Sequence, residues 1–205
     1  MKLGIQIALF LLIAFLSYEL YQSIKEPIVF QNEKDKRYNA VIESLKQIRS
    51  LQVAYKQVRG EYCDNWDTLI YFAKHESFRV VRAEGTRPDT IATDAEALAL
   101  GLIKRDTTYV SVKDSLFKKA SQLDSIKFVP FGKGEIFFLA KDTIPTASGV
   151  TVAVFEANAL NNVILNGLTK QEIVNMNAEA KKLKRFPGLK VGDVKEPNNN
   201  AGNWE

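Results

Sequence analysis

Hydrophobic and polar positions divide the chain into an apolar start, a long amphipathic stretch and a mixed remainder. The start, residues 3–21, is almost wholly apolar, with Gln6 as the polar side chain deepest within it. A helix that crosses a bilayer needs roughly 20 residues at about 1.5 Å each, and this segment approaches that length. Tyr18 and Tyr21 fall where aromatic rings favour the membrane interface. We therefore predict a transmembrane anchor over residues 1–26.

The same segment has an alternative interpretation as a cleaved signal peptide. Lys2 supplies a basic start, and the apolar run supplies the hydrophobic region of such a peptide. A cleavage site needs small residues at alternate positions, and neither residues 14–16 (Ala-Phe-Leu) nor residues 16–18 (Leu-Ser-Tyr) provide them. The sequence therefore favours an uncleaved anchor.

Charges that flank the anchor bear on its orientation. Lys2 and the α-amino group precede it, and four cations lie after it: Lys25, Lys34, Lys36 and Arg37. The positive-inside rule, taken alone, places the downstream body in the cytoplasm. However, long domains translocate largely regardless of flanking charge, and an N-terminal signal-like anchor usually delivers the downstream domain outward. We expect an inner (cytoplasmic) membrane protein, single-pass, with its body on the extracytoplasmic side.

The second stretch, residues 27–60, has the periodicity of an amphipathic stem helix. Apolar side chains recur at three- and four-residue steps and form its predicted packing face: Tyr38, Val41, Leu45, Ile48 and Tyr55. Pro27 is expected to end or kink the preceding helix because it lacks an N–H donor, and Gly60 is well placed to end the stem. A coiled-coil seam would cover only about three heptads and include Gln52, so we expect the helix to pack on its own body.

Residues 61–194 have the pattern of an α+β body that forms one domain with the stem helix. Helices are predicted over residues 66–75 after a cap at Asp64 or Asn65, from Thr93 or Asp94 to about 102, around 115–120, and from the capping box 169–172 to about 184. Strands are predicted over residues 78–82, 107–112, 125–131, 135–141 and 150–155.

The last three predicted strands are expected to form a small antiparallel meander on which the stem helix packs. Gly132, Lys133 and Gly134 join the first two as a hairpin turn. Residues 84–90 are predicted to be a loop, and residues 195–205 a flexible polar tail. The expected fold class is therefore α+β with an N-terminal transmembrane helix.

Composition narrows the functional classes. The chain has 205 residues and a net charge of +4, and its cations are spread beside acidic residues, which gives no reason to expect nucleic acid as a partner. A single cysteine, Cys63, excludes an intramolecular disulfide; a buried or free thiol is preferred over a pair with another chain. A single histidine, His75, excludes multi-histidine metal sites. We expect neither a cofactor nor a metal.

Several residues invite a chemical role and have a simpler structural one. His75 could act as a general base, but no nucleophile lies at a sequence spacing that would suggest a catalytic pair. We therefore prefer to interpret it as a surface histidine at a helix end. The Gly132–Gly134 turn lacks the spacing of a phosphate loop. Asp64, Asn65 and Asp67 fail the EF-hand pattern and suit helix capping.

Two further features concern association. A basic cluster at a helix end comprises Lys181, Lys182, Lys184 and Arg185. It could meet acidic lipid or a partner, although cations there also complement the helix dipole, which we prefer. Gln6 could donate a hydrogen bond to a neighbouring helix within the hydrocarbon. The expected partners are the lipid bilayer and other proteins or a second copy, contacted through the stem.

The exit from the stem resembles that of type IV pilins and secretion-system pseudopilins. The residues that carry the resemblance are 54–62 (Ala-Tyr-Lys-Gln-Val-Arg-Gly-Glu-Tyr) and 66–69 (Trp-Asp-Thr-Leu), after an apolar helix that continues into an amphipathic one. The resemblance implies an antiparallel sheet packed on the amphipathic half of the helix. It covers roughly the first seventy-five residues.

The chain departs from that family at the processing site. Prepilins carry a glycine before the cleavage point and a glutamate five residues into the mature chain. Here Gly4 is followed by Ile5, and Leu9 stands where the glutamate would fall. Processing by a prepilin peptidase and filament assembly through the usual charge pairing are therefore without support in this sequence.

These observations favour a non-enzymatic, pilin-like structural or assembly subunit of a cell-envelope complex. The alternative is a membrane-tethered extracytoplasmic domain that binds a soluble ligand or peptide. A third hypothesis, an enzyme, would need carboxylates that only the fold brings together.

Overall fold

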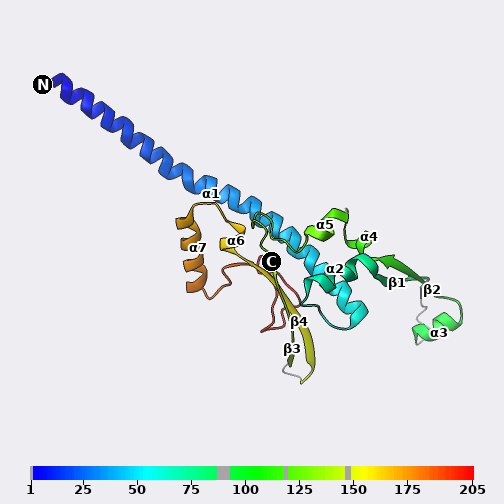
Figure 1. Ribbon diagram of the computed structural model, residues 1–205. Helices are drawn as coiled ribbons and strands as arrows, with labels where there is room; N and C mark the ends of the chain where they lie inside the picture. The colour runs from blue at the N-terminus through cyan, green and yellow to red at the C-terminus, as the bar shows by residue number, and fades with distance from the viewer. Residues whose placement is uncertain (1, 87–92, 118–119, 146–148) are drawn as a thin grey trace. The chain divides into compact units, whose positions relative to one another are not determined.

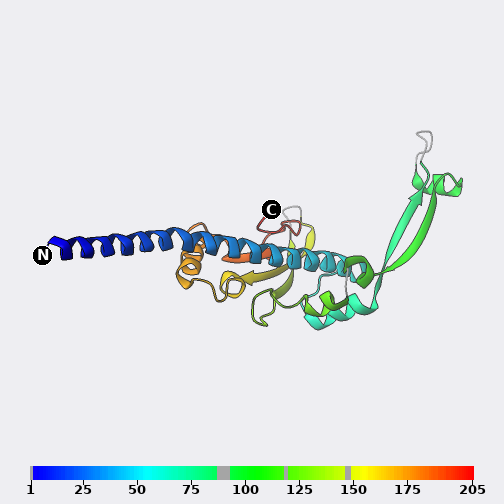
Figure 2. The same cartoon turned by 90° about the horizontal axis from the view of Figure 1, so that it is seen from above.

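The structure is a computed structural model that describes residues 2–86, 93–117, 120–145 and 149–205. It combines helices with a small antiparallel sheet, as predicted, and has one long apolar N-terminal helix. The chain divides into two compact units, whose elements appear in Figures 1 and 2. Unit 1 comprises Met1–Glu43, Val129–Ile136 and Ala159–Leu189, and unit 2 comprises Ser44–Phe128, Phe137–Asn158 and Lys190–Glu205.

The longest element is helix α1 (Lys2–Arg59), which begins in unit 1 and ends in unit 2. It ends where predicted. Gly60 adopts a φ of 82°, which residues with a Cβ atom rarely adopt. The Gly60 amide still donates a hydrogen bond of 2.8 Å to the carbonyl of Lys56, which closes the last turn.

Pro27 does not end the helix, so of the two predicted effects, an end or a kink, the helix end is wrong. The residue lies inside α1, where its missing N–H deprives the carbonyl of Ser23 of its helical partner. Ser23 and Pro27 are both exposed, so water can satisfy that carbonyl. Three residues later Phe30 is buried in unit 1, and this packing helps to hold the helical path beyond the proline.

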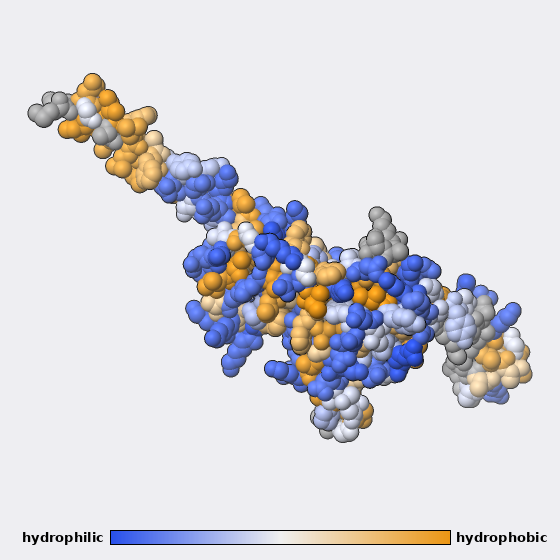
Figure 3. All heavy atoms as spheres, in the orientation of Figure 1, coloured by the Kyte–Doolittle hydropathy of each residue, from blue (hydrophilic) through white to orange (hydrophobic). Residues whose placement is uncertain are grey.

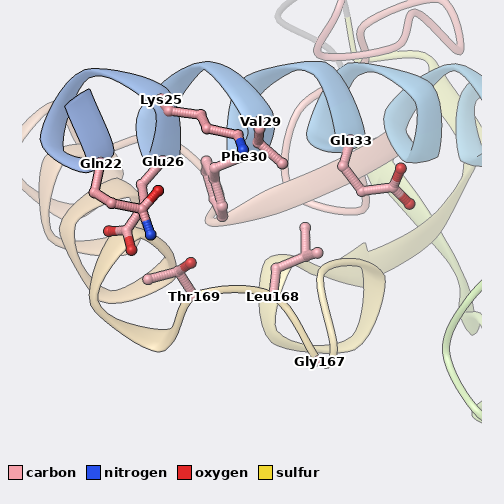
Figure 4. Close-up of a pocket in the computed structure, with 9 residues that line it drawn as sticks. All are labelled: Gln22, Lys25, Glu26, Val29, Phe30, Glu33, Gly167, Leu168 and Thr169. Atoms are coloured by element: carbon pink, nitrogen blue, oxygen red, sulfur yellow. The ribbon is translucent and has the colours of Figure 1, made fainter. Parts of the chain in front are cut away.

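Unit 1 adds helices α6 (Asn161–Ile164) and α7 (Lys170–Lys182) and the loop 129–136 to the first part of α1. Its buried apolar residues are Phe30, Val41, Val129, Ala159, Ile164, Leu165, Ile173 and Leu189. Helix α7 starts where predicted, but Thr169 makes no side-chain capping bond. Its side chain instead lies beside α1 (Figure 4), so the predicted capping box does not form.

The helices of unit 2 come after the end of α1. They are α2 (Trp66–His75), α3 (Asp94–Ala99), α4 (Val112–Leu116) and α5 (Ala120–Ser125). The predicted caps of the first two are confirmed: Asn65 Oδ1 accepts from the amides of Asp67 (2.9 Å) and Thr68 (3.0 Å), and Thr93 Oγ1 accepts from the amide of Glu96 (3.3 Å). The largest fully buried side chains of unit 2 include Leu45, Ile48, Leu51, Leu69, Phe72, Leu123, Phe137 and Phe155.

Strands β1 (Ser77–Glu84) and β2 (Lys104–Ser111) form an antiparallel ribbon in unit 2. The register runs from Ser77 opposite Ser111 to Glu84 opposite Lys104. Both strands were predicted, although Val112 starts α4 instead of ending β2. The predicted loop 84–90 lies partly outside the described residues.

The second sheet has the order β3 (Phe138–Pro145), β4 (Thr151–Leu160), β5 (Gly188–Gly192). Strands β3 and β4 are antiparallel, as predicted for residues 135–141 and 150–155. The short strand β5 was not predicted. It runs antiparallel to β4, because Gly188 packs on the carbonyl of Ala159 and Gly192 on that of Phe155.

The predicted strand over residues 125–131 is reduced to one bridge residue, Phe128, so the first member of the three-strand meander does not form as a strand. Hairpin-like pairing across the predicted turn remains, since the amide of Phe137 donates 2.9 Å to the carbonyl of Lys127. Ser125 ends α5, and the chain then turns. In unit 1 the amide of Val129 donates 2.8 Å to the carbonyl of Glu135, which closes a tight loop. Phe131, the last residue of the predicted strand, has a φ of 64°, which is incompatible with a strand. Lys133 and Gly134, in the predicted turn, also have positive φ, which suits a tight turn.

Residues 195–205, expected to form a flexible tail, make specific contacts within unit 2. Gly202 pairs with Val191 as an antiparallel bridge, and the amide of Asn203 donates 3.0 Å to the carbonyl of Lys190. Glu205 forms an ion pair of 2.7 Å with Arg49 of α1. The last residues therefore extend the edge of the sheet at β5.

Candidate functional site

The N-terminal part of α1 is apolar and exposed. An 18-residue window has a mean hydropathy of 2.0, and none of it is buried. Figure 3 shows apolar side chains over this part of α1 on the face in view, and polar side chains further along. By length and composition, this helix could cross a membrane. Gln6 lies exposed within the segment, and its association with another helix stays a prediction.

The later part of α1 is embedded in the two units. In unit 1 Val41 is fully buried, and in unit 2 Leu45 and Ile48 are fully buried. Tyr38 and Tyr55, at either end of the proposed packing face, are half-buried. One helix thus carries a wholly exposed apolar segment and a segment whose apolar stripe is covered.

Arg37 ties α1 to the segment that precedes α7 in unit 1. Its Nη1 donates to the carbonyls of Ile164 (3.3 Å) and Asn166 (2.9 Å), and its Nε donates 3.0 Å to Glu33 Oε1. The guanidinium also lies 5.1 Å from the ring centroid of Phe131. The hydrogen bond from Arg37 lowers the pKa of Glu33, so the carboxylate stays charged beside its partner.

A chain of polar side chains crosses unit 1 from α1 to α7. The Tyr38 hydroxyl donates to Asn161 Oδ1, Asn161 Nδ2 donates 2.9 Å to Asn177 Oδ1, and Asn177 Nδ2 donates 2.9 Å to Asn162 Oδ1. Asn161 is only 3% exposed, so its amide would be costly to bury without these partners. Burial, together with the nearby charge of Asp35, raises the pKa of Tyr38 to about 12, and the hydroxyl therefore stays protonated as a donor.

These asparagines were not among the residues that the sequence pattern singled out. The available signal was the pair Asn161-Asn162, placed between a strand and the apolar residues after it. Paired amides in such a position suit buried hydrogen bonding, but their partners on α1 and α7 lie far away in sequence and required the fold to identify.

A first pocket of about 430 Å³ lies in unit 1 between α1 and the segment 167–169. Figure 4 shows Phe30 projecting from α1 toward Leu168 and Thr169, with the polar ends of Gln22 and Glu26 at one side. Gln22 comes directly after Tyr21, so the pocket begins where the apolar segment of α1 ends.

A second pocket, of about 350 Å³, lies in unit 1 and takes none of its lining from α1. Its lining residues come from the end of β4, from α6, and from α7 with the segment after it: Leu160, Asn162, Asn177, Lys181, Arg185 and Pro187. Two members of the predicted basic cluster therefore meet two of the bridging asparagines here. All four cations of the cluster are exposed, and Lys182 and Lys184 do not line the pocket.

In unit 2 a buried amide joins α1 to the chain beyond Gly60. Gln52 is fully buried, its Nε2 donates 2.6 Å to the carbonyl of Cys63, and its Oε1 accepts 3.0 Å from the amide of Cys63. Cys63 is a buried free thiol, and burial raises its pKa. A buried thiol of raised pKa is a poor nucleophile.

The other residues for which a chemical role was considered have structural contacts instead. His75 lies at the end of α2, where its Nδ1 is 3.0 Å from the carbonyl of Tyr71 and its ring stacks on Tyr71. Asn65 serves as the cap of α2. Within the described ranges, no group of three or more His, Cys, Asp or Glu side chains is placed to hold a metal ion.

The coarse architecture is therefore a mixed fold with a small antiparallel sheet and one long N-terminal helix that is apolar over its first part. The two pockets described here both lie in unit 1, one beside α1 and one between β4, α6 and α7. No protein-family model, no curated protein and no solved structure matches the chain.

Proposed function

We propose that the protein is a single-pass, membrane-anchored structural or assembly subunit of a cell-envelope complex, and that it is not an enzyme. The observation that carries the proposal is helix α1, one element that is apolar and exposed over its first part and buried in the folded units over its second. The apolar segment and the covered segment belong to one continuous helix.

The anchor belongs, in this proposal, to the inner (cytoplasmic) membrane, with the folded units on the extracytoplasmic side. Support comes from an apolar segment at the start of the chain, which resembles signal anchors that deliver the downstream domain outward. The pilin-like character of the protein is part of the same proposal. It is supported by the helix exit at Gly60 and by a small antiparallel sheet.

Association within the membrane is proposed to involve Gln6. A carboxamide surrounded by hydrocarbon gains from a hydrogen bond to a neighbouring helix, typically by about 0.6–2 kcal/mol. Gln6 is exposed, and no residue of the described chain covers the helix around it.

The experiment is purification of the intact protein from its native membrane in mild detergent, with the mass of the particle measured by light scattering and its components by mass spectrometry. We expect a homo-oligomer or a co-purifying protein, and a roughly 3- to 30-fold weaker association for Gln6→Leu, the factor that corresponds to about 0.6–2 kcal/mol. Ile5→Leu is the matched control and should behave as the wild type. A protein that is monomeric and without partners would count against the proposal.

A second candidate is a membrane-tethered domain that binds a soluble ligand. The pocket between β4, α6 and α7 favours it, because the volume of about 350 Å³ lies within the usual range of small-molecule sites and α1 contributes nothing to the lining.

A further inference from the structure

The side chains that line the pocket between β4, α6 and α7 include two cations and two carboxamides, and no carboxylate. Asn177 Oδ1 already accepts from Asn161, and Asn162 Oδ1 already accepts from Asn177. What remains toward a ligand is the Nδ2 group of Asn162, the second hydrogen of Asn177 Nδ2, and the cationic groups of Lys181 and Arg185. Since Lys181 and Arg185 can only donate, the lining offers more donors than acceptors, and a ligand that supplies acceptors suits it.

The direction of the amide chain is set at its buried end. Tyr38 donates to Asn161 Oδ1, and its raised pKa keeps the hydroxyl protonated. Asn161 therefore turns its Nδ2 toward Asn177, which in turn donates to Asn162. Reversing the chain would make the Tyr38 hydroxyl the acceptor and would leave its proton without the partner that Asn161 Oδ1 provides.

The cations of the pocket are not neutralised by the protein. Within the part of the chain that the structure describes, Lys181 and Arg185 form no ion pair, and no acidic residue lines the pocket. Lys181 lies in the last turn of α7 and Arg185 three residues after the helix, at the end where cations complement the helix dipole. The dipole explains the presence of cations at this end of the helix, but it does not explain the carboxamide groups that line the pocket with them.

An apolar wall completes the pocket. Leu160, 45% exposed, and Pro187 line it beside the polar groups. A bare inorganic anion would leave this surface uncovered, whereas an anion with a short hydrocarbon group would cover it.

We propose that this pocket binds a phosphate or carboxylate group attached to a short apolar moiety, with Lys181 and Arg185 on the anionic oxygens, Asn162 as a neutral donor, and Leu160 and Pro187 against the hydrocarbon. Arginine and lysine are the usual partners of such oxygens. The inference rests on the second candidate function, ligand binding, and is independent of assembly through α1. The source of the group, a membrane lipid or a soluble metabolite, is left to the test.

The test uses the intact protein in zwitterionic detergent micelles, with the side-chain amide signals of Asn162 and Asn177 followed by NMR. Butyl phosphate is the probe, inorganic phosphate is the headgroup alone, and butanol and butyltrimethylammonium are the neutral and cationic counterparts. We expect saturable shifts with butyl phosphate, weaker binding of inorganic phosphate, and no saturable shift with the other two. Equal shifts with butanol or butyltrimethylammonium would overturn the proposal.

Charge reversal separates a built site from diffuse attraction. The double variant Lys181→Glu, Arg185→Glu should weaken butyl phosphate binding roughly tenfold or more, because both charge-assisted contacts are lost. Lys182→Glu, Lys184→Glu changes the net charge equally, next to the pocket but outside its lining, and should weaken binding less than about threefold. Equal losses in the two variants would contradict the assignment. Backbone amide shifts of α7 confirm that each variant is folded.

Asn162→Asp keeps the shape of the side chain and replaces its donor group with a carboxylate. Because Asn162 is exposed, the variant should fold, and it should bind butyl phosphate at least about tenfold more weakly. Unchanged binding would overturn the role of this residue.

Bilayers identify the source of the group. In phosphatidylcholine bilayers that contain one third phosphatidylglycerol, a shift of the Asn162 signal without added probe assigns the site to a lipid headgroup. A shift only after addition of butyl phosphate assigns it to a soluble ligand. If none of these experiments detects binding while the protein is still an oligomer in detergent, the pocket proposal is wrong and the assembly proposal is unaffected.

Discussion

Gln52 holds the end of α1 to the chain that leaves it. The side chain is fully buried and exchanges two hydrogen bonds with the backbone of Cys63. In the sequence Gln52 is a polar residue within the apolar stripe of the stem helix. The periodicity of that stripe alone could not show that a backbone amide and a backbone carbonyl would face its side chain. The interruption is a position where the fold requires a donor and an acceptor together.

Gln52→Leu is expected to lower the free energy of unfolding of unit 2 by roughly 2–4 kcal/mol, because the amide and carbonyl of Cys63 would stay buried without partners. Urea unfolding followed by the fluorescence of Trp66 and Trp204, which both lie in unit 2, measures the change. Gln57→Leu is the control on the same helix, since Gln57 is exposed, and its change should stay within about 0.5 kcal/mol. Equal effects of the two substitutions would contradict the role of Gln52.

Arg37 has in unit 1 the role that Gln52 has in unit 2: it joins α1 to the backbone of another segment, through two carbonyls before α7. Arg37→Ala should destabilise unit 1 by roughly 1–3 kcal/mol, because the carbonyls of Ile164 and Asn166 lose a charged donor. Hydrogen exchange of the α6 and α7 amides should accelerate accordingly.

The control for Arg37 is Lys36→Ala. Lys36 also pairs with Glu33, at 3.7 Å, but its side chain is 69% exposed, and exposed pairs contribute little. Exchange in α7 that is as fast in Lys36→Ala as in Arg37→Ala would show that Arg37 has no special role in holding unit 1.

At the scale of elements, local sequence signals predicted where helices begin and end better than they predicted whether a helix continues through a given residue. Asn65, Thr93 and Gly60 mark helix boundaries that the structure confirms, because capping and positive φ depend on the residues at hand. Pro27 was also a local signal, but the helix end that it could have produced does not occur, since Ser23 is exposed to water and the burial of Phe30 supports the helix beyond the proline.

The second sheet shows more clearly what the hydrophobic pattern of the sequence could not predict. Residues 125–131 have the apolar composition of a strand, yet α5 and the turns of the loop 129–136 take that segment. Strand β5 contains two glycines within five residues and was not recognised, because its place depends on close backbone approach to β4. The second pocket was beyond prediction for the same reason, since its lining comes from β4, α6 and α7.

The last residues of the chain provide a pH-dependent test at this scale. The hydrogen bond from Arg49 lowers the pKa of Glu205, so the carboxylate is more stable in the folded chain than in the unfolded one. This contribution is present above the ordinary pKa of a glutamate and is lost as the pH falls through the lowered folded value. Limited proteolysis of residues 195–205 should therefore accelerate on acidification.

Glu205→Gln removes the charge that responds to pH. Its proteolysis rate should be higher than that of the wild type at neutral pH and should change less on acidification. A variant with the same pH profile as the wild type would show that Glu205 does not hold the segment.

At the scale of the whole molecule, the proposed membrane location rests on the first part of α1. A segment of mean hydropathy 2.0 without buried residues has no cover within the described chain, and a bilayer is the environment that suits it. Assembly through α1 requires that this segment stays attached and lies in the membrane. Anion binding in the second pocket does not.

The most direct measurement combines alkaline extraction of membranes with mass spectrometry of the N-terminal peptide, on the intact chain expressed in a Gram-negative bacterium. We expect that the protein stays in the membrane pellet, that the peptide containing residues 3–21 is present, and that protease added to spheroplasts digests residues 61–205. A soluble protein that lacks residues 3–21 would contradict the anchor, and a body protected from protease in intact spheroplasts would contradict its orientation.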